Sequence, residues 1–469
     1  MTKQTKSSTT VEIGQRFPLT AKKIGINGEG IGYFQHKVTF VPGLLPHEVA
    51  VCEVTEVAPN YLRAKIHRLR KQSPIRNQNV PSVANEVGGL EFAHIQYSQQ
   101  LFFKNDLIKQ ALAKYQPRGY QQYQFLKPIG ATQTEAYRNK AQFPVQETSD
   151  GKLICGLYRP RSHDLVDLPE MPTQGKVSLA VCRKLLPILS NLQIPIYNAA
   201  RHSGIIKALA VRENQQGQAQ LTFITNSKKL PHKRALLAAI KVKLPEVISI
   251  NQNFNPDPAT LFWGEETWLL AGQPYLTETL LGKSFLLSPR AFLQLNHEQT
   301  EKMYQQVQAA LDLQPDDILL DAYAGVGTIG LSLADQVRQV IGIEILPEAV
   351  HDAQKNSQLN HITNAHYYTG KVETIWPELR QQGQKITALV VDPPRTGLDQ
   401  ALIKTILQEQ PKKFVYLSCN ESTLARDLTL LTKKYRVQSL QMIDLFPQTA
   451  RVETIVNLTL KNQVQPQKK

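Results

Sequence analysis

The apolar positions divide the chain into a part where helices and strands alternate and a part with short strands alone. From about residue 282 onward, short apolar runs alternate with amphipathic stretches. The runs that read as strands are 317–322, 340–345, 366–370, 386–392, 413–419 and 436–444. Between them, one stretch carries Met303, Val307 and Leu311 at helical spacing. This alternation predicts an α/β fold, with a doubly wound sheet over residues 282–461.

Residues 11–72 have a different pattern, in which short strands are separated by turn residues. The pattern predicts a small all-β barrel. In its last strand, Leu62, Ala64 and Ile66 alternate with polar residues, so one face is apolar and the other is basic. We expect the basic face to follow a phosphate backbone, and a merely solvated surface is the alternative. The basic residues are Arg63, Lys65, Arg68 and Arg70.

The amino-acid composition indicates that the protein has a polyanionic partner. The 469 residues have a net charge of +15, and residues 1–80 alone hold twelve Lys and Arg against five Asp and Glu. Nucleic acid is favoured over a membrane, because no strongly amphipathic basic helix is present. No apolar run approaches the ~20 residues of a membrane span, and the start has no apolar signal segment. We therefore expect a cytoplasmic protein, by default a monomer, with disordered polar ends at 1–10 and 462–469.

The region between the two patterned parts is mixed. A helical pattern covers 96–119, which we expect to pack on the C-terminal domain. Strand-like and helical runs fill 73–95 and 120–281, and we assign these ranges to a mixed α+β central domain that binds RNA. The basic and aromatic run EAYRNKAQF offers Arg138 and Lys140 as candidate RNA contacts.

A glycine-rich loop follows the first strand of the C-terminal pattern. Gly325, Gly327 and Gly330 form GxGxxG, and Glu344 ends the next strand nineteen residues after Gly325. Glycines let the backbone approach a nucleotide, and an acid at this spacing can accept both ribose hydroxyls. The motif alone does not distinguish NAD(P) from S-adenosylmethionine. Asp321 ahead of the loop, and the later DPPR motif, favour S-adenosylmethionine.

Two further strand ends carry candidate chemistry. Asp392 begins DPPR after an apolar strand, and its stiff loop can present the carboxylate to a cofactor or a flat ring, although a structural turn is the alternative. Cys419 lies where a strand ends and a helix begins, a position that favours the thiolate and therefore a nucleophile. The alternative is a small buried apolar residue. Similar xPPx motifs occur in enzymes that methylate exocyclic amines without a thiol, so Cys419 separates the two chemistries.

Metal binding is not predicted by the cysteines. The chain has four, at widely separated positions and without a CxxC pair, which argues against a disulfide framework or a zinc site.

Six motifs occur in the order found in one enzyme family. They are FLLSPRAFLQLN, LLDAYAGVGTIGLSLA, GIEILPEAV, VVDPPRTGLD, YLSCNESTLARDL and FPQTARVETIV. This set resembles the RNA uracil-5-methyltransferases, which depend on S-adenosylmethionine. The run GEGIGYFQHKVTFVPGLLPHEV resembles their N-terminal TRAM barrel. The chain looks most like the bacterial 23S rRNA branch of that family.

The resemblance implies a fold and a reaction. The fold is a class I, Rossmann-like methyltransferase domain with an OB-like TRAM barrel and a mixed central domain. Cys419 would add to uracil C6, C5 would take the methyl group, and Glu453 would remove the C5 proton. Asp392 would lie at the junction of cofactor and uracil. The family's other cofactor-binding positions fall on Gln294, Tyr323, Gly325, Gly327, Thr328 and Glu344.

The implied function is therefore methylation of uridine C5 in 23S rRNA. A tRNA uracil-5-methyltransferase is one alternative, and the N-terminal barrel argues against it. A catalytically silent RNA-binding or ribosome-assembly protein is another, although it would have no reason to keep Cys419, Glu453 and the glycine loop together. An NAD(P) oxidoreductase is the third.

The chain also departs from the family pattern. Arg451 stands where the family has histidine, and Lys371 where it has an acid. Where many members read CGGC, residues 87–90 read Val-Gly-Gly-Leu, and the fourth ligand position of their iron–sulfur cluster falls on Met171. We therefore expect no iron–sulfur cluster, and an apolar cluster in its place.

Overall fold

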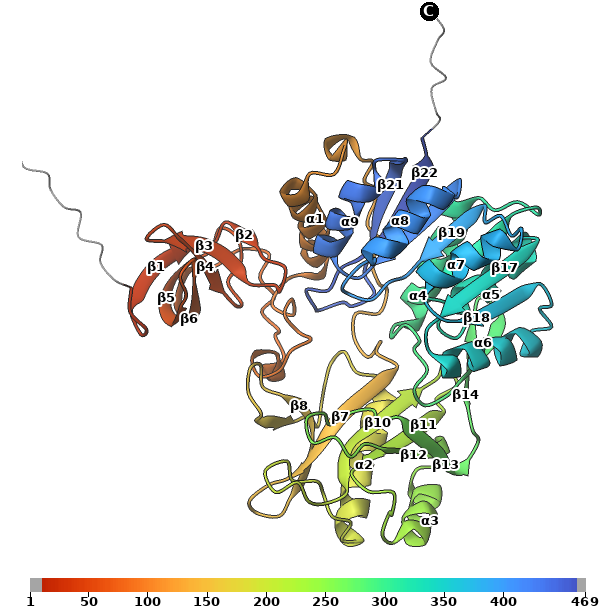
Figure 1. Ribbon diagram of the computed structural model, residues 1–469. Helices are drawn as coiled ribbons and strands as arrows, with labels where there is room; N and C mark the ends of the chain where they lie inside the picture. The colour runs from red at the N-terminus through yellow and green to blue at the C-terminus, as the bar shows by residue number, and fades with distance from the viewer. Residues whose placement is uncertain (1–10, 462–469) are drawn as a thin grey trace, which may run out of the picture.

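The protein has three lobes, arranged as an N-terminal barrel, a central domain and a C-terminal domain (Figure 1). The computed structural model describes residues 11–461. The ends predicted to be disordered, 1–10 and 462–469, lie outside these residues.

The N-terminal lobe is one curled sheet with strand order β1-β5-β6-β4-β3-β2. Its strands are β1 (Arg16–Thr20), β2 (Lys23–Ile24), β3 (Gly30–Phe34), β4 (Lys37–Val41), β5 (Val49–Val57) and β6 (Tyr61–Lys71). Gly32 marks a close approach of two strands, because a Cβ there would lie 2.8 Å from Leu19 Cδ1. The alternation predicted for β6 is present, since Leu62 and Ala64 are buried while Lys65 is exposed.

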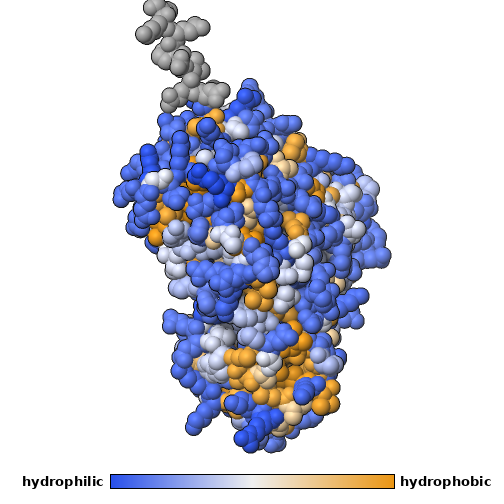
Figure 2. Space-filling view, turned by 90° about the vertical axis from the view of Figure 1, so that its right-hand side faces the viewer, coloured by the Kyte–Doolittle hydropathy of each residue, from blue (hydrophilic) through white to orange (hydrophobic). Residues whose placement is uncertain are grey.

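The central lobe is a seven-stranded sheet of order β13-β12-β11-β10-β7-β8-β9. Its strands are β7 (Lys140–Glu147), β8 (Leu153–Tyr158), β9 (Leu165–Asp167), β10 (Ile206–Glu213), β11 (Ala219–Thr225), β12 (Val247–Phe254) and β13 (Glu266–Gly272). Helices α2 (Lys176–Asn191) and α3 (Lys233–Lys243) share its apolar core. In Figure 2, apolar residues gather over this lobe, and its exposed apolar side chains include Val242 of α3 and Leu269 of β13.

The C-terminal lobe is the predicted α/β sheet, with order β18-β17-β16-β19-β20-β22-β21. Its strands are β16 (Ile318–Ala322), β17 (Gln339–Glu344), β18 (Ala365–Thr369), β19 (Ala388–Val391), β20 (Lys413–Ser418), β21 (Tyr435–Ile443) and β22 (Glu453–Leu460). The neighbouring helices are α4 (His297–Leu311), α5 (Thr328–Leu333), α6 (Pro347–Leu359), α7 (Val372–Gln381), α8 (Gln400–Glu409) and α9 (Glu421–Leu431). Strand β22 was not among the six predicted strands, and it inserts antiparallel between β20 and β21.

Two linking segments join this lobe to the others. Helix α1 (Tyr97–Tyr115) places Leu107 and Ile108 in the C-terminal core, as predicted for the helix at 96–119, although it ends four residues before that range does. Residues 124–130 run along β21, with bridges Phe125 to Leu440 and Ile129 to Ile443, although the sequence pattern placed them with the central domain.

A separate hairpin precedes the C-terminal sheet. It consists of β14 (Leu276–Leu280) and β15 (Lys283–Leu287), and it contacts α6.

Within residues 11–461, no helix is long and apolar enough to cross a membrane.

Candidate active site

The candidate catalytic residues meet at one end of the C-terminal sheet. Asp392 directly follows β19, and Cys419 directly follows β20, the parallel neighbour of β19. Strand β22 starts at the same end with Glu453, because Ser418 pairs with Thr454 in the antiparallel ladder. One further step of this register places Cys419 opposite Glu453. Residues opposite one another in such a ladder have Cβ atoms about 5 Å apart.

Cys419 is partly buried just ahead of α9. Burial raises the pKa of its thiol to about 12, with the negative charges of Glu453 and Asp392 adding to the rise and Arg395 opposing it. The first free amides of α9 donate to the side chain of Asn420, at 3.0 Å from Ser422 N and 3.4 Å from Thr423 N. The expectation that the helix start favours the thiolate is therefore wrong for the protein without substrate, because burial and two acids outweigh it.

Both neighbouring acids also have a raised pKa. Glu453 is buried, which raises its pKa well above the usual value, and Asp392 raises it further while Arg395 and Lys104 oppose the rise. Burial raises the pKa of Asp392 to about 7, against a hydrogen bond of 3.1 Å that Gln294 Nε2 donates to Asp392 Oδ2. The site thus gathers three acidic groups that hold their protons more tightly than they would in water.

A buried ion pair anchors the loop between β21 and β22 to α1. Lys104 Nζ of α1 donates to Asp444 Oδ1 at 2.5 Å and to Phe446 O at 2.8 Å, and both side chains of the pair are fully buried. Tyr97 Oη also donates to Asp444, at 2.9 Å. The helix predicted to pack on this domain therefore fixes the segment that leads to Glu453.

The glycine loop follows β16 and is held by Glu344. Gly325 N donates to Glu344 Oε2 at 3.0 Å, and Leu346 N donates to Glu344 Oε1 at 2.9 Å. A Cβ on Gly325 would meet no atom within 4 Å, so the space beside the loop is open. Tyr323 has a positive φ of 67°. Thr328 is nearly buried, and its hydroxyl lies 2.8 Å from the hydroxyl of Tyr304 in α4.

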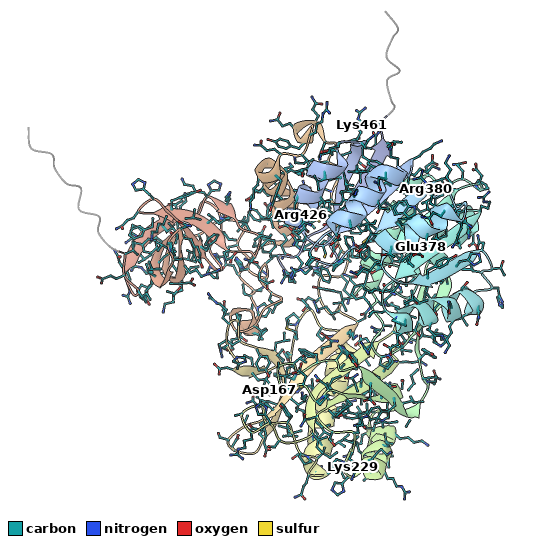
Figure 3. The ribbon with its side chains drawn as sticks, in the orientation of Figure 1. Asp167, Lys229, Glu378, Arg380, Arg426 and Lys461 are labelled. Atoms are coloured by element: carbon teal, nitrogen blue, oxygen red, sulfur yellow. The ribbon has the colours of Figure 1, made fainter. Side chains whose placement is uncertain are left out.

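A cavity adjoins this loop on the side of α8 and α9. It has a volume of about 470 Å³, and its lining includes Tyr323, Pro394 and Arg426. Arg426 (Figure 3) holds the loop after DPPR by donating to Thr396 O at 2.9 Å.

The predicted RNA contacts fall into three environments. Arg63 pairs with Glu29 and with Glu56, each at 3.4 Å, and Lys65 pairs with Glu53 at 2.9 Å. Arg68 and Arg70 are exposed, and the part of the chain that the structure describes offers neither an ion pair. Lys140 Nζ lies 5.0 Å from the centre of the Trp263 ring, and Arg138 bridges to the backbone of Asn296, two residues beyond Gln294.

Two residues near the site were not singled out from the sequence. Phe292 is 65% exposed although it lies only two residues before Gln294. Arg395, the last residue of DPPR, acts electrostatically on Cys419 and Glu453. The motifs FLLSPRAFLQLN and DPPR contained both residues. Nothing in the pattern showed that Phe292 would be exposed, or that Arg395 would be near enough to the thiol to act on its pKa.

Family comparisons match both ends of the chain. Residues 268–461 match the family described as tRNA (Uracil-5-)-methyltransferase, and residues 10–67 match the TRAM domain. An RNA methyltransferase of Lactiplantibacillus plantarum is 53% identical over 97% of this chain and 95% of its own length. One of Listeria monocytogenes is 45% identical over 96% and 99%.

The fold as a whole has a solved counterpart. The Pyrococcus abyssi tRNA (uracil-54, C5)-methyltransferase, solved with S-adenosyl-L-homocysteine, is 24% identical with a TM-score of 0.74. The match covers 95% of this chain and 100% of that one, so the three-lobed arrangement is common to both.

Proposed function

Because this chain belongs to the S-adenosylmethionine-dependent RNA uracil-5-methyltransferase family, we propose that it methylates uridine C5 in 23S rRNA through a bond between Cys419 and uracil C6. The observation that carries the proposal is the meeting of Cys419, Glu453 and Asp392 at one end of the sheet, beside the glycine loop. A thiol and a separate base are the groups that this chemistry needs.

The residues present fit S-adenosylmethionine. Each oxygen of Glu344 accepts one backbone amide, which fixes the carboxylate while leaving lone pairs for ribose hydroxyls. The open space beside Gly325 lets a nucleoside approach the backbone. Gln294, Tyr323, Gly327 and Thr328 complete the proposed set, with Thr328 acting from its bond to Tyr304. When bound, S-adenosylmethionine supplies an electrophilic methyl group for C5.

Cys419 begins the reaction on the RNA. Its Sγ bonds to C6, the C5–C6 π electrons move toward C4 and O4, and the thiol proton passes to a neighbouring carboxylate. Asp392 suits that proton transfer, since a pKa of about 7 leaves it largely ionised in slightly basic solution. The resulting enolate makes C5 nucleophilic. The uridine must leave its stack to reach the pocket.

Glu453 acts after the methyl group has been added. Its carboxylate removes the C5 proton, the C5–C6 double bond forms again, and the bond from Cys419 to C6 breaks with the electrons returning to sulfur. Its raised pKa makes the Glu453 carboxylate a stronger base for this step. Lys104 and Arg395 oppose that rise and so favour the ionised form that the step requires.

RNA binding involves the barrel and the central domain. Arg68 and Arg70 project freely from β6 and suit the phosphate backbone. Arg63 and Lys65 already hold carboxylates within the barrel, so their contribution to RNA binding should be smaller. Arg138 bridges to Asn296 in the loop that carries Gln294, and Lys140 lies two residues farther along the chain, so both would contact RNA close to the reacting uridine.

A tRNA substrate is the second candidate. The Pyrococcus abyssi enzyme named for tRNA matches 95% of this chain, which is too much of it to omit the barrel. The barrel is therefore no argument against a tRNA substrate, contrary to the expectation from the sequence. The motif resemblance to the 23S rRNA branch is what favours rRNA.

An apolar cluster occupies the positions at which the family resemblance places iron–sulfur ligands in many members. Val87, Leu90 and Met171 are buried in the same core cluster of the central domain. Thioether and aliphatic side chains cannot supply the thiolates that such clusters need. We propose that packing fixes this loop and that the protein works as a cytoplasmic monomer without iron.

Mapping of 5-methyluridine in a deletion strain tests the function. We expect one or more uridines in 23S rRNA to lose the methyl group, and the wild-type gene to restore it while Cys419→Ala does not. Loss in tRNA with unchanged 23S rRNA would establish the second candidate. Unchanged methylation in both RNAs would contradict the proposal.

A further inference from the structure

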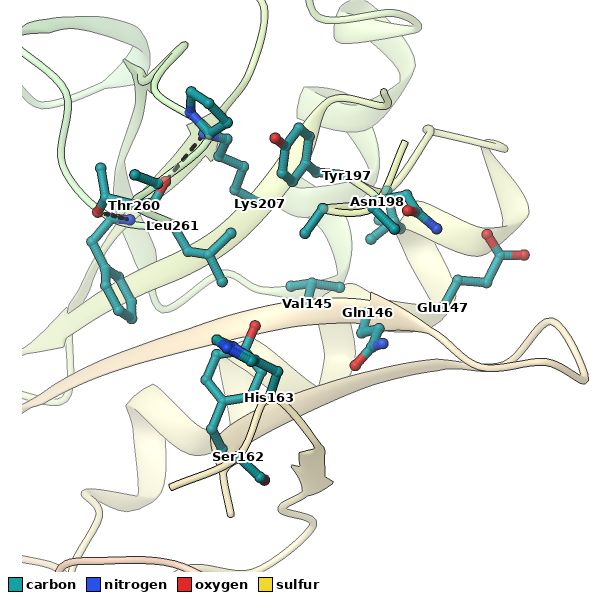
Figure 4. A pocket seen from close by; sticks show the side chains of 17 residues that line it. Val145, Gln146, Glu147, Ser162, His163, Tyr197, Asn198, Lys207, Thr260 and Leu261 are labelled. Atoms are coloured by element: carbon teal, nitrogen blue, oxygen red, sulfur yellow. Dashed lines mark hydrogen bonds between the residues drawn. The ribbon is translucent and has the colours of Figure 1, made fainter. Parts of the chain in front are cut away.

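A large cavity lies in the central domain and shares no lining residue with the candidate active site. Its volume is about 710 Å³, and its lining residues all fall between Val145 and Phe262. Figure 4 shows Val145, Gln146 and His163 on one side and Tyr197, Lys207 and Leu261 on the other. Cavities of about 300 to 1,000 Å³ are typical of small-molecule and cofactor sites.

The floor of the cavity carries a buried cation. Lys207 of β10 is 1% exposed, and its Nζ donates to Asp257 O at 2.6 Å and Thr260 O at 3.1 Å. An ammonium group has three donors, and these bonds to neutral carbonyl oxygens use two of them. The Nζ atom also lies 4.7 Å from the centre of the Tyr197 ring. Burial lowers the pKa of Lys207, and the negative charge of Asp257 opposes that lowering and favours the charged form.

The walls combine aromatic rings with amides. Tyr158 of β8 and His163 lie edge to face with centroids 6.3 Å apart, and Tyr197 and Phe262 supply two more rings. The amides of Gln146 and of Asn198 also line the cavity. The remaining polar lining comes from the hydroxyls of Ser162 and Thr260 and from the carboxylate of Glu147, which neighbours Gln146 on β7. A nucleobase offers a flat face for stacking and a polar edge for hydrogen bonds, so these walls match both of its surfaces.

A loop that lines the cavity also contacts the N-terminal barrel. The loop that supplies Ser162 and His163 carries Arg161 between them and Tyr158, and Arg161 Nη1 lies 3.6 Å from Glu56 Oε2 of β5. Strand β5 pairs with β6, the strand that bears the exposed basic side chains. An RNA strand that follows β6 would therefore pass close to the mouth of the cavity.

We propose that this cavity receives one unpaired nucleotide of the RNA substrate. Its base would stack on the aromatic walls, and its polar edge or phosphate would meet Lys207. The proposal rests on the proposed function only in taking RNA as the substrate. Such a site would hold the RNA at a second point away from the reacting uridine, and would select RNAs with an unpaired nucleotide at a fixed distance from it.

Kinetics of the full-length protein test the proposal. Tyr158→Ala and Phe262→Ala remove two walls, and Leu269→Ala on the exposed edge strand of the same sheet is the matched control. With rRNA from the deletion strain, we expect KM for RNA to rise about tenfold in the two cavity variants, as for the loss of one base–aromatic stack. The kcat should stay near wild type and the control should be unchanged. An unchanged KM in both cavity variants would overturn the proposal.

Photo-crosslinking locates the nucleotide without requiring methyl transfer. A short oligouridylate containing 4-thiouridine should crosslink to peptides that contain Tyr158, Tyr197 or Phe262, and Leu269→Ala should not change the yield. Crosslinks with no methylation would sink the proposed function alone, whereas methylation without crosslinks at the cavity would sink this proposal alone. If free AMP or UMP blocks the crosslink while the variants keep the wild-type KM, the site serves a free nucleotide and the RNA assignment is wrong.

Discussion

Alkylation of Cys419 in the RNA-free protein should be slow. Burial together with Glu453 and Asp392 raises the pKa of this thiol from 9.0 to about 12, so its thiolate fraction below pH 9 is about a thousandfold lower than that of an ordinary cysteine. A more basic thiolate is also more nucleophilic, and this raises the reaction rate of each thiolate about twentyfold. We therefore expect iodoacetamide to react with Cys419 roughly 50-fold more slowly than with the same cysteine in urea-unfolded protein.

The assay is time-resolved mass spectrometry of the peptide that contains Cys419. The rate should rise about tenfold per pH unit from pH 7 to pH 10 without levelling off, because the thiol titrates above that range. Asp392→Asn should speed the reaction, since it removes an anion that disfavours the thiolate. A folded protein that reacts at the urea rate at pH 7.5, with a plateau near neutrality, would refute the reasoning.

Three other predictions follow from the charges and the packing. Asp392→Asn should raise the thermal midpoint of cofactor-free protein. The pKa of Asp392 is about 7 in the folded protein and 3.8 in the unfolded protein, so its ionisation costs the folded state increasing stability as pH rises from about 4 to 7. Thermal scans at pH 5 and pH 8 check this, and an equal gain at both would contradict it. Arg68→Gln with Arg70→Gln should lower the salt slope of RNA binding by nearly two, while Arg63→Gln with Lys65→Gln changes it less; equal slopes for the two pairs would speak against the barrel contacts. Protein purified without oxygen should contain no stoichiometric iron or acid-labile sulfide by elemental analysis, and finding both would show ligands that the packing does not suggest.

The sequence predicted the sheet better than it predicted the site. Strand periodicity located β16 and β20 to within a residue, because strands in the middle of a sheet that is covered on both faces are continuous apolar runs. It did not find β22, whose position between β20 and β21 is set by tertiary pairing. Without that register, the facing of Cys419 and Glu453 could only be taken from a family resemblance.

The electrostatics of the site could not be predicted from the sequence. A cysteine ahead of a helix suggests a stabilised thiolate. In the folded protein, burial of the thiol and the negative charges of two acids distant in sequence disfavour that thiolate. In the same way, four basic residues on β6 looked alike, but Arg63 and Lys65 have carboxylate partners that only the folded barrel brings near. Pairing between distant segments decides both outcomes, and single-segment patterns do not contain it.

A denaturing gel of the Glu453→Gln variant with RNA and S-adenosylmethionine tests the central claim most directly. The variant should still form the bond from Cys419 to C6 and methylate C5, but it lacks the base that removes the C5 proton, so a protein–RNA adduct should accumulate and survive denaturation. Mass spectrometry should place the RNA on Cys419, and the double variant with Cys419→Ala should give no adduct. Release of methylated RNA at the wild-type rate, with no adduct on the gel, would contradict the account.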